Sequence, residues 1–267
     1  MKKYCGAFIK NEREIGLLRE ANRIVANILD AAAEVIKPGA TTRMIEEMAM
    51  DMCSDYKVNP AFLGYCGYPY ATCCSVNEQV VHGFPNDRKL EEGDIVSFDM
   101  GVAREGFVGD AARTFAVGRP DEETARLMRI TEESLYVGIE KAVAGNDVYD
   151  IGEAIQKYVE GAGFNVVRQF VGHGVGAKMH EKPAVPNFRP AGKGLTLQNG
   201  MVIAIEPMVT AGGYDVEILP DKWTAVTKDG KKAAHYEHSV AITPRGPKIL
   251  SVSDRGLNRA TWRNLTV

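Results

Sequence analysis

The sequence predicts an α+β fold in which two duplicated αβ halves share one sheet. Three observations carry this prediction: an amphipathic helix near the start, a strand hairpin further on, and a repeat of the same order later in the chain. The 267 residues, 45% hydrophobic and 25% charged, can bury a substantial core. No linker-like composition separates the halves, so we expect one domain over residues 1–267, with halves at about 12–118 and 121–250.

Apolar residues at helical spacing predict the first element of each half. Residues 12–36 place their apolar side chains on one helical face, and a Lys-Pro-Gly sequence ends that helix. Residues 61–85 are typical of strand and loop. Further helices are predicted over residues 43–55, 121–143 and 151–162, the last opened by Asp150 as N-cap with Glu153 three residues later.

The repeat links the two halves. Residues 90–99 and 197–206, 107 positions apart, follow one pattern. Each begins with Leu-x-x-Gly-x and continues with two apolar residues, a small residue, an apolar residue and an acid. Upstream, Gly39, Ile45 and Glu47 match Gly145, Ile151 and Glu153 at an offset of 106. Two matches at nearly one offset indicate a duplicated unit. In each repeated strand a small residue, Ser97 or Ala204, shares a face with the terminal acid and leaves space in front of it.

The hairpin over residues 99–114 carries a carboxylate on each strand. A two-residue turn at Arg104-Glu105 would place Asp99 directly opposite Asp110. Like charges at such a pair repel, and two buried carboxylates must share a proton or hold a cation. A proton-sharing dyad therefore remains open from the hairpin alone, although a metal is favoured.

The remaining polar motifs favour the metal. His173 lies among glycines that allow close backbone approach or unusual dihedrals, and His180 follows seven residues later. Glu206 precedes a proline, and Glu237 precedes an apolar strand. Four carboxylates and an imidazole suit Mn, Fe, Co or Zn, and their charge exceeds what one divalent ion neutralises. The pattern thus indicates two metal ions and metal-assisted hydrolysis, with a bridging hydroxide between the ions.

Composition excludes several other classes. The net charge of −3 and the lack of a run of basic residues argue against nucleic acid as the main ligand. The start has no apolar region typical of a signal peptide, and no stretch is long and apolar enough for a membrane span. Five cysteines without a Cys-x-x-Cys pair predict reduced thiols in the cytoplasm rather than a structural zinc site.

From about residue 10 to 250, the chain resembles the type I methionine aminopeptidases. The motifs that carry the resemblance occur in family order: NEQVVHGFP, DMG with GDAART, GHGVG with HEKP, AIEP and YEHS. The resemblance implies the pita-bread fold, in which the duplicated halves share a curved antiparallel sheet with helices on its outer face. It also implies removal of the initiator methionine from nascent polypeptides whose second residue is small.

The resemblance assigns roles to the metal-binding residues. Asp99 would bind one ion, Asp110 and Glu237 would bridge both, and His173 with Glu206 would hold the other ion. The ions would be two divalent metals (Co, Mn, Fe or Zn).

The resemblance also assigns residues to substrate and catalysis. Glu206 would help to activate water, and His82 and His180 would contact the substrate and stabilise the intermediate or the leaving amine. The methionine pocket would be lined by Phe62, Tyr65, Tyr68, Cys73, Met179 and Trp223.

Some positions depart from the family pattern. Phe62 and Met179 stand where a cysteine and a phenylalanine are frequent, Cys66 where many relatives have histidine, and Met100 where valine is usual. These changes stay apolar or soft, so they bear on pocket shape rather than on the reaction. The sequence has neither an N-terminal Cys/His zinc region nor a long insertion between His180 and Glu206, as expected for the short bacterial form.

Two alternatives share the fold. A prolidase or aminopeptidase P would carry the same ligands, usually after a large N-terminal domain, and only about 80 residues precede His82 here. A non-catalytic binding protein of the same fold would typically lack ligands, and all five are present here. The family resemblance further implies a monomer near the ribosome, with no direct binding of nucleic acid or membrane.

Overall fold

A computed structural model describes residues 2–256, which contain four α-helices and seventeen strands. Residue 1 and residues 257–267, which the one-domain prediction includes, lie outside the described residues. The helices are α1 (Glu12–Val35), α2 (Thr42–Tyr56), α3 (Glu122–Ile139) and α4 (Val148–Gly161), with a short 3₁₀ turn, η1, at Tyr65–Gly67.

Helix starts follow local capping chemistry. Asn11 and Glu14 form a reciprocal capping box at α1. The N-cap predicted for the fourth helix, Asp150, is wrong: α4 begins at Val148, and its N-cap is Asp147. The Asp147 side chain accepts from the backbone N–H of Tyr149 (2.9 Å), and Asp150 accepts from the N–H of Asp147 (3.0 Å). Asp150 is therefore the N3 partner of the cap.

Helix α3 ends at Ile139, four residues before the predicted end. Its last turn tightens: the N–H of Lys141 donates to Gly138 and that of Ala142 to Ile139, at 2.9 Å each. These bonds to the third preceding residue are typical of a 3₁₀ ending.

The strands of residues 2–256 form five antiparallel sheets, which confirms the α+β class. The four-stranded sheet holds β3 (Asn59–Pro60), β6 (Ile95–Arg104), β4 (Thr72–Val76) and β7 (Phe107–Ala116), with β7 paired to β6. The five-stranded sheet runs β10 (Glu181–Val185), β9 (Gly172–Gly174), β11 (Val202–Ile205), β16 (His238–Thr243), β17 (Gly246–Ile249). The smaller sheets are β15 (Ala233–His235), β12 (Met208–Thr210), β8 (Asn165–Val166); β13 (Val216–Ile218), β14 (Ala225–Thr227), β5 (Gln79–Val81); and β1 (Lys2–Tyr4), β2 (Ala7–Ile9).

The expected shared sheet is divided where the halves meet. There the backbone N–H of Glu237 donates to the carbonyl of Ala112 (2.9 Å), and the Ser239 hydroxyl donates to the carbonyl of Asp110 (2.9 Å). Single bonds of this kind, one of them from a side chain, replace a continuous ladder. They still hold the segment before β16 beside β7.

The predicted register of the β6–β7 hairpin is wrong by two residues. Arg104 pairs with Phe107, so Glu105 and Gly106 form the turn, with φ of 48° and 80°. Two central residues at positive φ define the type I′ turn, and glycine is favoured at its second position. Asp99 consequently lies opposite Ala112 rather than opposite Asp110.

The predicted repeat has matching hydrogen bonds in the two halves. Before α2, the N–H of Gly39 donates to the carbonyl of Leu90 at 2.8 Å. Before α4, the N–H of Gly145 donates to the carbonyl of Leu197 at 2.9 Å. Both glycines have positive φ, 86° and 97°. The sequence repeat thus corresponds to a repeated way of joining each second helix to the strand that follows it.

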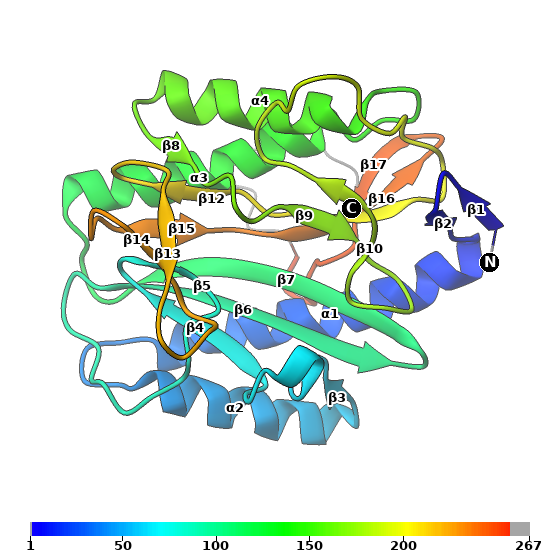
Figure 1. The fold of residues 1–267 in the computed structure, drawn as a ribbon. Coiled ribbons are helices and arrows are strands. Elements are labelled where there is room, and N and C mark those ends of the chain that lie inside the picture. The colour runs from blue at the N-terminus through cyan, green and yellow to red at the C-terminus, as the bar shows by residue number, and fades with distance from the viewer. Residues whose placement is uncertain (1, 257–267) are drawn as a thin grey trace.

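The helices lie in two pairs on either side of the strands. Figure 1 shows α1 and α2 along one side, and α3 and α4 along the other. One buried cluster joins α1 and α2 to β4, β6 and β7, around Phe98 and Ile24. A second joins α3 and α4 to the strands of the other half, around Ile151 and Ile203. Each pair of helices therefore packs mainly on the strands of its own half, while Leu18 of α1 also shares a buried cluster with Val202 and Ala241 of the second half.

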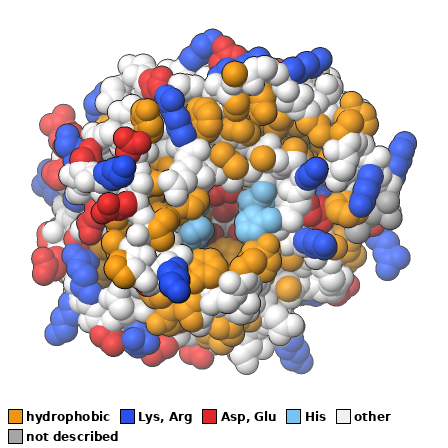
Figure 2. All heavy atoms as spheres, in the orientation of Figure 1, with side chains coloured by type: hydrophobic (Ala, Val, Ile, Leu, Met, Phe, Trp, Pro, Cys, Tyr) orange, Lys and Arg blue, Asp and Glu red, His pale blue; other side chains and the backbone are white. Residues whose placement is uncertain are grey.

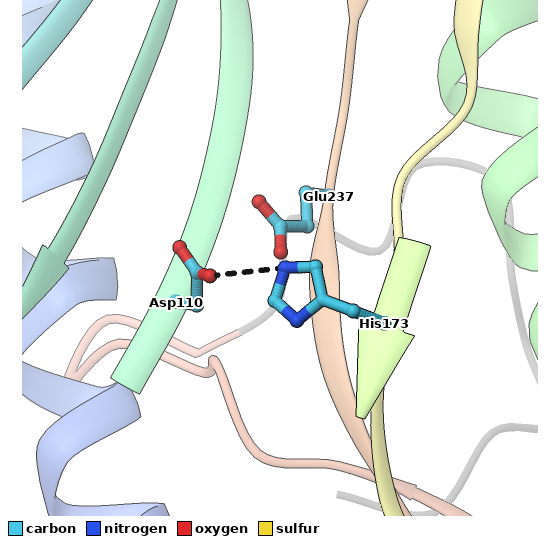
Figure 3. Close-up of side chains that lie close together, drawn as sticks. All are labelled: Asp110, His173 and Glu237. Atoms are coloured by element: carbon cyan, nitrogen blue, oxygen red, sulfur yellow. Dashed lines mark ion pairs between the residues drawn. The ribbon is translucent and has the colours of Figure 1, made fainter. Parts of the chain in front are cut away.

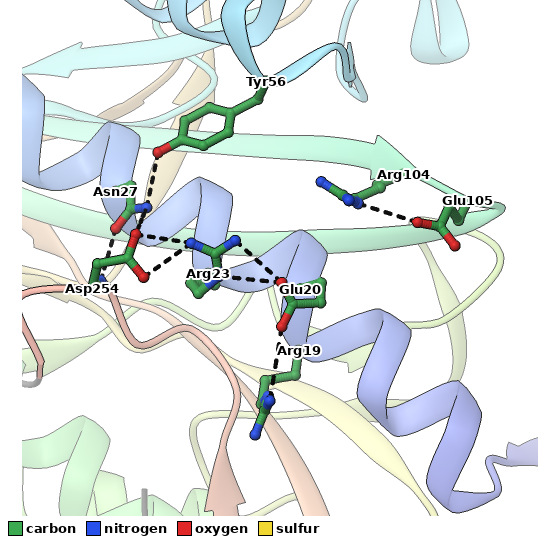
Figure 4. Close-up of polar contacts among 8 residues, drawn as sticks. All are labelled: Arg19, Glu20, Arg23, Asn27, Tyr56, Arg104, Glu105 and Asp254. Atoms are coloured by element: carbon green, nitrogen blue, oxygen red, sulfur yellow. Dashed lines mark hydrogen bonds and ion pairs between the residues drawn. The ribbon is translucent and has the colours of Figure 1, made fainter.

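Exposed polar contacts fasten the last described residues to α1. Asp254 accepts from Arg23 (2.8 Å) and Asn27 (2.7 Å), and Asn27 also donates to the Tyr56 hydroxyl (2.9 Å) (Figure 4). Because the Asp254 side chain is 61% exposed, solvent screens this ion pair and it contributes little to stability. No helix within residues 2–256 combines the length and the apolar character needed to cross a bilayer.

Candidate metal centre and substrate cavity

One cavity of about 310 Å³ opens between the two halves. Figure 2 shows histidine and acidic side chains in a central hollow, surrounded by hydrophobic side chains. All thirteen residues predicted for the site line this cavity: Phe62, Tyr65, Tyr68, Cys73, His82, Asp99, Asp110, His173, Met179, His180, Glu206, Trp223 and Glu237.

Three of these side chains converge in the way that a metal ion requires. One ligand atom each of Asp110, His173 and Glu237 lies within 4.8 Å of the others. Figure 3 shows the three side chains pointing toward one another from separate segments. The His173 Nε2 is 3.6 Å from an oxygen of Asp110 and 3.5 Å from an oxygen of Glu206.

The strand arrangement explains why distant acids meet. Asp99 and Asp110 share one face of the β6–β7 hairpin because Asp99 pairs with Ala112 two positions along. Glu206 directly follows β11 and Glu237 directly precedes β16, two strands that pair through Ile205 and His238. The bond from Glu237 to Ala112 then brings the second pair of acids beside the first.

Glycines next to His173 permit close packing of β9. A Cβ atom on Gly172 would lie 2.3 Å from the carbonyl oxygen of Ala204, and one on Gly174 2.3 Å from that of Lys182. Both glycines lack positive φ, so close backbone approach is the reason for them. The Nδ1 of His173 lies 3.0 Å from the carbonyl oxygen of Gly174. Because Nδ1 must donate there, Nε2 presents its lone pair to the acids.

Burial and mutual repulsion perturb the acids. Burial raises the pKa of Asp99 to about 7. Burial, with the charges of Asp99 and Glu206, raises the pKa of Asp110 well above its usual range. The pKa of Glu206 rises through burial and the charge of Asp99, and that of Glu237 through burial and the charges of all three other acids. Such a cluster is unfavourable when ionised unless cations neutralise it.

Unpartnered oxygens show that the donor set fits a cation. Asp99 Oδ1, Asp110 Oδ1 and Glu237 Oε1 are buried and have no hydrogen-bond partner among the described residues. Buried polar atoms are almost always paired. Carboxylate oxygens with one imidazole nitrogen are ligands that divalent first-row metals accept.

Two further histidines form part of the cavity wall. Burial, with nearby His180, lowers the pKa of His82 to about 4, and burial lowers the pKa of His180. Both rings are therefore neutral at pH 7. The Nδ1 of His180 lies 2.8 Å from the Tyr65 hydroxyl, and its ring contacts that of His173 at 4.2 Å between centroids. His180 thus lies beside His173 in the cavity wall.

Aromatic and sulfur-containing side chains form the apolar part of the cavity. The rings of Tyr68 and Trp223 meet edge to face at 5.1 Å. The Tyr68 hydroxyl donates to the carbonyl of Thr72 (3.0 Å), so this buried ring keeps its polar end satisfied. Cys73 and Met179 are buried beside them. Polarisable walls of this kind favour a thioether ligand.

Sequence reasoning did not assign several residues of the site. Val81, Phe170, Val171 and Met208 also line the cavity, as does Cys66. The Phe170 ring meets that of His82 edge to face at 5.5 Å. The signal in the sequence that could have predicted Phe170 as a site residue is its position three residues before His173.

A buried ion pair holds the β9–β10 loop that carries His180. Lys10 Nζ lies 2.7 Å from Glu181 Oε2, and both side chains are 1% exposed. A Cβ atom on Gly176 would lie 2.5 Å from the Glu181 carboxylate. The N-terminal segment is thereby fastened to the residue next to His180.

Comparisons with known proteins agree with this geometry. Residues 16–244 match the metallopeptidase family M24. The methionine aminopeptidase of Clostridium perfringens is 52% identical over 244 residues, which are 91% of this chain and 98% of that protein. The crystal structure of methionine aminopeptidase from Thermotoga maritima superposes with a TM-score of 0.90 at 46% identity, covering 92% of this chain and 99% of that one.

A prolidase shares the fold alone. The structure of the prolidase from Pyrococcus horikoshii superposes with a TM-score of 0.75 at 24% identity, covering 92% of this chain but 64% of that one. Identity and coverage are both higher for the methionine aminopeptidases. The chain therefore belongs to metallopeptidase family M24 and, within it, to the methionine aminopeptidases of the bacterial type.

Proposed function

We propose that this chain is a metal-dependent aminopeptidase that hydrolyses the peptide bond after an N-terminal methionine. The observation that carries the proposal is one cavity in which four carboxylates and His173 adjoin an apolar, sulfur-containing wall. The activity named for its relatives supports the same reaction. We further propose that the preferred substrates have a small second residue.

The metal would be held by the five ligands in the cavity. We propose two divalent ions, because four carboxylates carry more negative charge than one such ion neutralises. Asp99 would bind one ion, and His173 with Glu206 the other, while Asp110 and Glu237 would reach both. Cobalt, manganese, iron and zinc all accept this donor set.

When bound, divalent ions act as Lewis acids toward the substrate carbonyl and supply a water-derived nucleophile at neutral pH. Hydrolysis adds water across the peptide bond: the carbonyl carbon gains the oxygen, the C–N bond breaks, and the leaving amine gains a proton. Glu206 would accept the proton of the attacking water. Its position in the cavity lining, 3.5 Å from Nε2 of His173, supports this role.

The neutral histidines would act as hydrogen-bond donors. The Tyr65 hydroxyl lies 2.8 Å from Nδ1 of His180 and would donate to it, which would leave the ring proton on Nε2 for donation to the substrate. His82 would make a corresponding contact from the opposite wall. Preorganised donors of this type stabilise charge that develops on the carbonyl oxygen in the transition state.

The apolar wall would select methionine. Phe62, Tyr65, Tyr68, Cys73, Met179 and Trp223 would contact its side chain. Each sulfur–aromatic contact is worth roughly 0.3–1.5 kcal/mol, so a few of them discriminate against a shorter side chain.

We also propose that residues 1–267 act as one catalytic domain, since the cavity takes residues from both halves. The proposed setting is the cytoplasm, where a monomer meets nascent N-termini near the ribosome. A net charge of −3 supports the absence of direct nucleic-acid binding. Sedimentation of the purified protein, alone and with ribosomes, tests the oligomeric state and the association.

The activity test compares two peptides. The protein is loaded separately with each metal, its metal content is measured, and release of methionine from Met-Ala-Ser is compared with cleavage of an X-Pro dipeptide. We expect about two ions per chain and cleavage of Met-Ala-Ser only. Cleavage of the X-Pro dipeptide alone would indicate a prolidase, and metal binding without cleavage of either would indicate a binding protein.

A further inference from the structure

His235 is a buried histidine without a role in the site described so far. It ends β15, is 1% exposed, and does not line the cavity. Its backbone is held by Thr114 of β7: the N–H of His235 donates to the Thr114 hydroxyl (2.9 Å), which donates to the carbonyl of His235 (2.8 Å). Because the N–H and the carbonyl of His235 are both hydrogen-bonded to Thr114, the backbone that carries the ring is held in place.

The Nε2 of this ring is buried and has no hydrogen-bond partner among the described residues. It lies 3.7 Å from Glu206 Oε2. The other oxygen of the same carboxylate, Oε1, lies 3.5 Å from His173 Nε2. Two imidazoles therefore approach Glu206, one at each oxygen.

The two imidazoles differ in their hydrogen bonds and in their position relative to the cavity. His173 donates through Nδ1 to a backbone carbonyl, so its Nε2 is an acceptor and lines the cavity. The ring of His235 is buried next to Glu206 and does not line the cavity. A buried ring nitrogen without a hydrogen-bond partner is unfavourable. Among residues 2–256, Glu206 is the acid within 4 Å of the His235 Nε2.

We propose that His235 is a positioning residue for Glu206: its ring carries a proton on Nε2 and donates it in a hydrogen bond to Oε2, which leaves Oε1 turned toward His173. This inference rests on the proposed function, in which Glu206 and His173 hold a divalent ion. A bond at Oε2 selects one rotamer of the carboxylate and one oxygen for the metal. The two atoms lie 3.7 Å apart in this structure, which is longer than a hydrogen bond, so the proposal requires the Glu206 carboxylate to move toward His235 when it binds the ion.

Mutation of a residue that is hydrogen-bonded to a metal ligand typically lowers metal affinity about 10–100-fold. The first test is calorimetric titration of Mn²⁺ into the metal-free protein. His235→Leu removes the donor at similar size and should weaken the affected site about 10–100-fold. His235→Gln retains a neutral N–H donor and should stay within a few-fold of the wild-type affinity.

His238→Gln is the matched control. His238 flanks Glu237 on its other side, but its ring contacts the hydroxyls of Ser251 (2.7 Å) and Tyr136 (3.3 Å) instead of a carboxylate. We expect wild-type Mn²⁺ affinity in this variant. An equal loss in His238→Gln and His235→Leu would overturn the proposal, because the loss would then reflect damage to the surrounding strands.

The second test reads the tautomer directly. Nitrogen-15 NMR of the Zn²⁺-loaded protein should show the His235 proton on Nε2. A proton on Nδ1, with Nε2 bonded to the metal, would make His235 a ligand and overturn the positioning role. If the wild-type protein binds no divalent ion, the proposed function fails; if it binds normally and His235→Leu binds equally well, only this inference fails.

Discussion

Asp99 and Asp110 lie on the same face of the β6–β7 hairpin, displaced by two residues rather than directly opposite. Asp99 pairs with Ala112, and Asp110 pairs with Gly101. Diagonal neighbours are further apart than directly opposed side chains but remain on one surface. The displacement leaves room between the carboxylates, and Gly101 leaves the position opposite Asp110 without a side chain.

Asp99→Asn should remove one metal and most of the activity while leaving the protein folded. The amide has nearly the same shape but cannot supply an anionic ligand, and it relieves the repulsion among buried acids. We expect about one ion per chain by elemental analysis and a loss of activity of more than roughly tenfold. Full activity in this variant would contradict the dinuclear site.

The metal-free protein should lose stability as the pH rises. The pKa of Asp99 is about 7 in the folded state against 3.8 for the unfolded chain, so the folded state binds more protons between these values. The stability that the protonated acid contributes is complete below about pH 3.8 and is lost progressively as the pH rises toward 7.

The measurement is thermal unfolding of the wild type and of Asp99→Asn with a chelator present. Because both proteins have the same exposed carboxylates, the difference between their pH profiles reports the contribution of Asp99. The melting temperature of the wild type should fall relative to that of the variant between pH 4.5 and 7. Parallel curves would show that Asp99 is not buried as the structure has it.

His180→Ala should keep both metals and lower kcat. The ring lies at the cavity wall and is assigned to the substrate, so its loss removes a donor to developing charge. Removing one such donor costs on the order of 100-fold or more in rate. Steady-state kinetics and elemental analysis of one preparation check this, and a reduced metal content would refute the assignment to substrate.

Gly101→Ala should raise KM for methionine substrates more than it lowers kcat. A Cβ atom there would lie 2.9 Å from Met179 Cε and 3.0 Å from Phe62 Cε1, two flexible side-chain ends that would move into the pocket. Overpacking of this kind costs roughly 1–3 kcal/mol. Kinetics on Met-Ala-Ser measure the split between KM and kcat.

Gly106→Ala is the control for this prediction. It lies at the tip of the same hairpin, where φ is 80° and a Cβ atom meets nothing within 4 Å. It should cost about 1 kcal/mol of stability through the positive φ and leave KM unchanged. A rise in KM as large as that of Gly101→Ala would show that loss of stability, not pocket volume, is responsible.

The sequence alone determined the class of fold and the repeat, and it predicted thirteen of the residues that line the cavity. Helical periodicity and the Leu-x-x-Gly pattern are local properties, so they predicted α1, α2 and the duplicated strands close to where the structure has them. The motif residues are likewise local, and their family resemblance located thirteen side chains that one cavity brings together.

Tertiary structure decided how those residues meet. The hairpin register depended on which residues tolerate positive φ at the turn, and a slip of two kept both acids on one face while changing their partners. The contact between Glu206 and His235 depends on strands about 30 residues apart that pack behind the cavity. A lone histidine carries no sequence signal for such a contact, because its partner is set by packing between segments rather than by spacing along the chain.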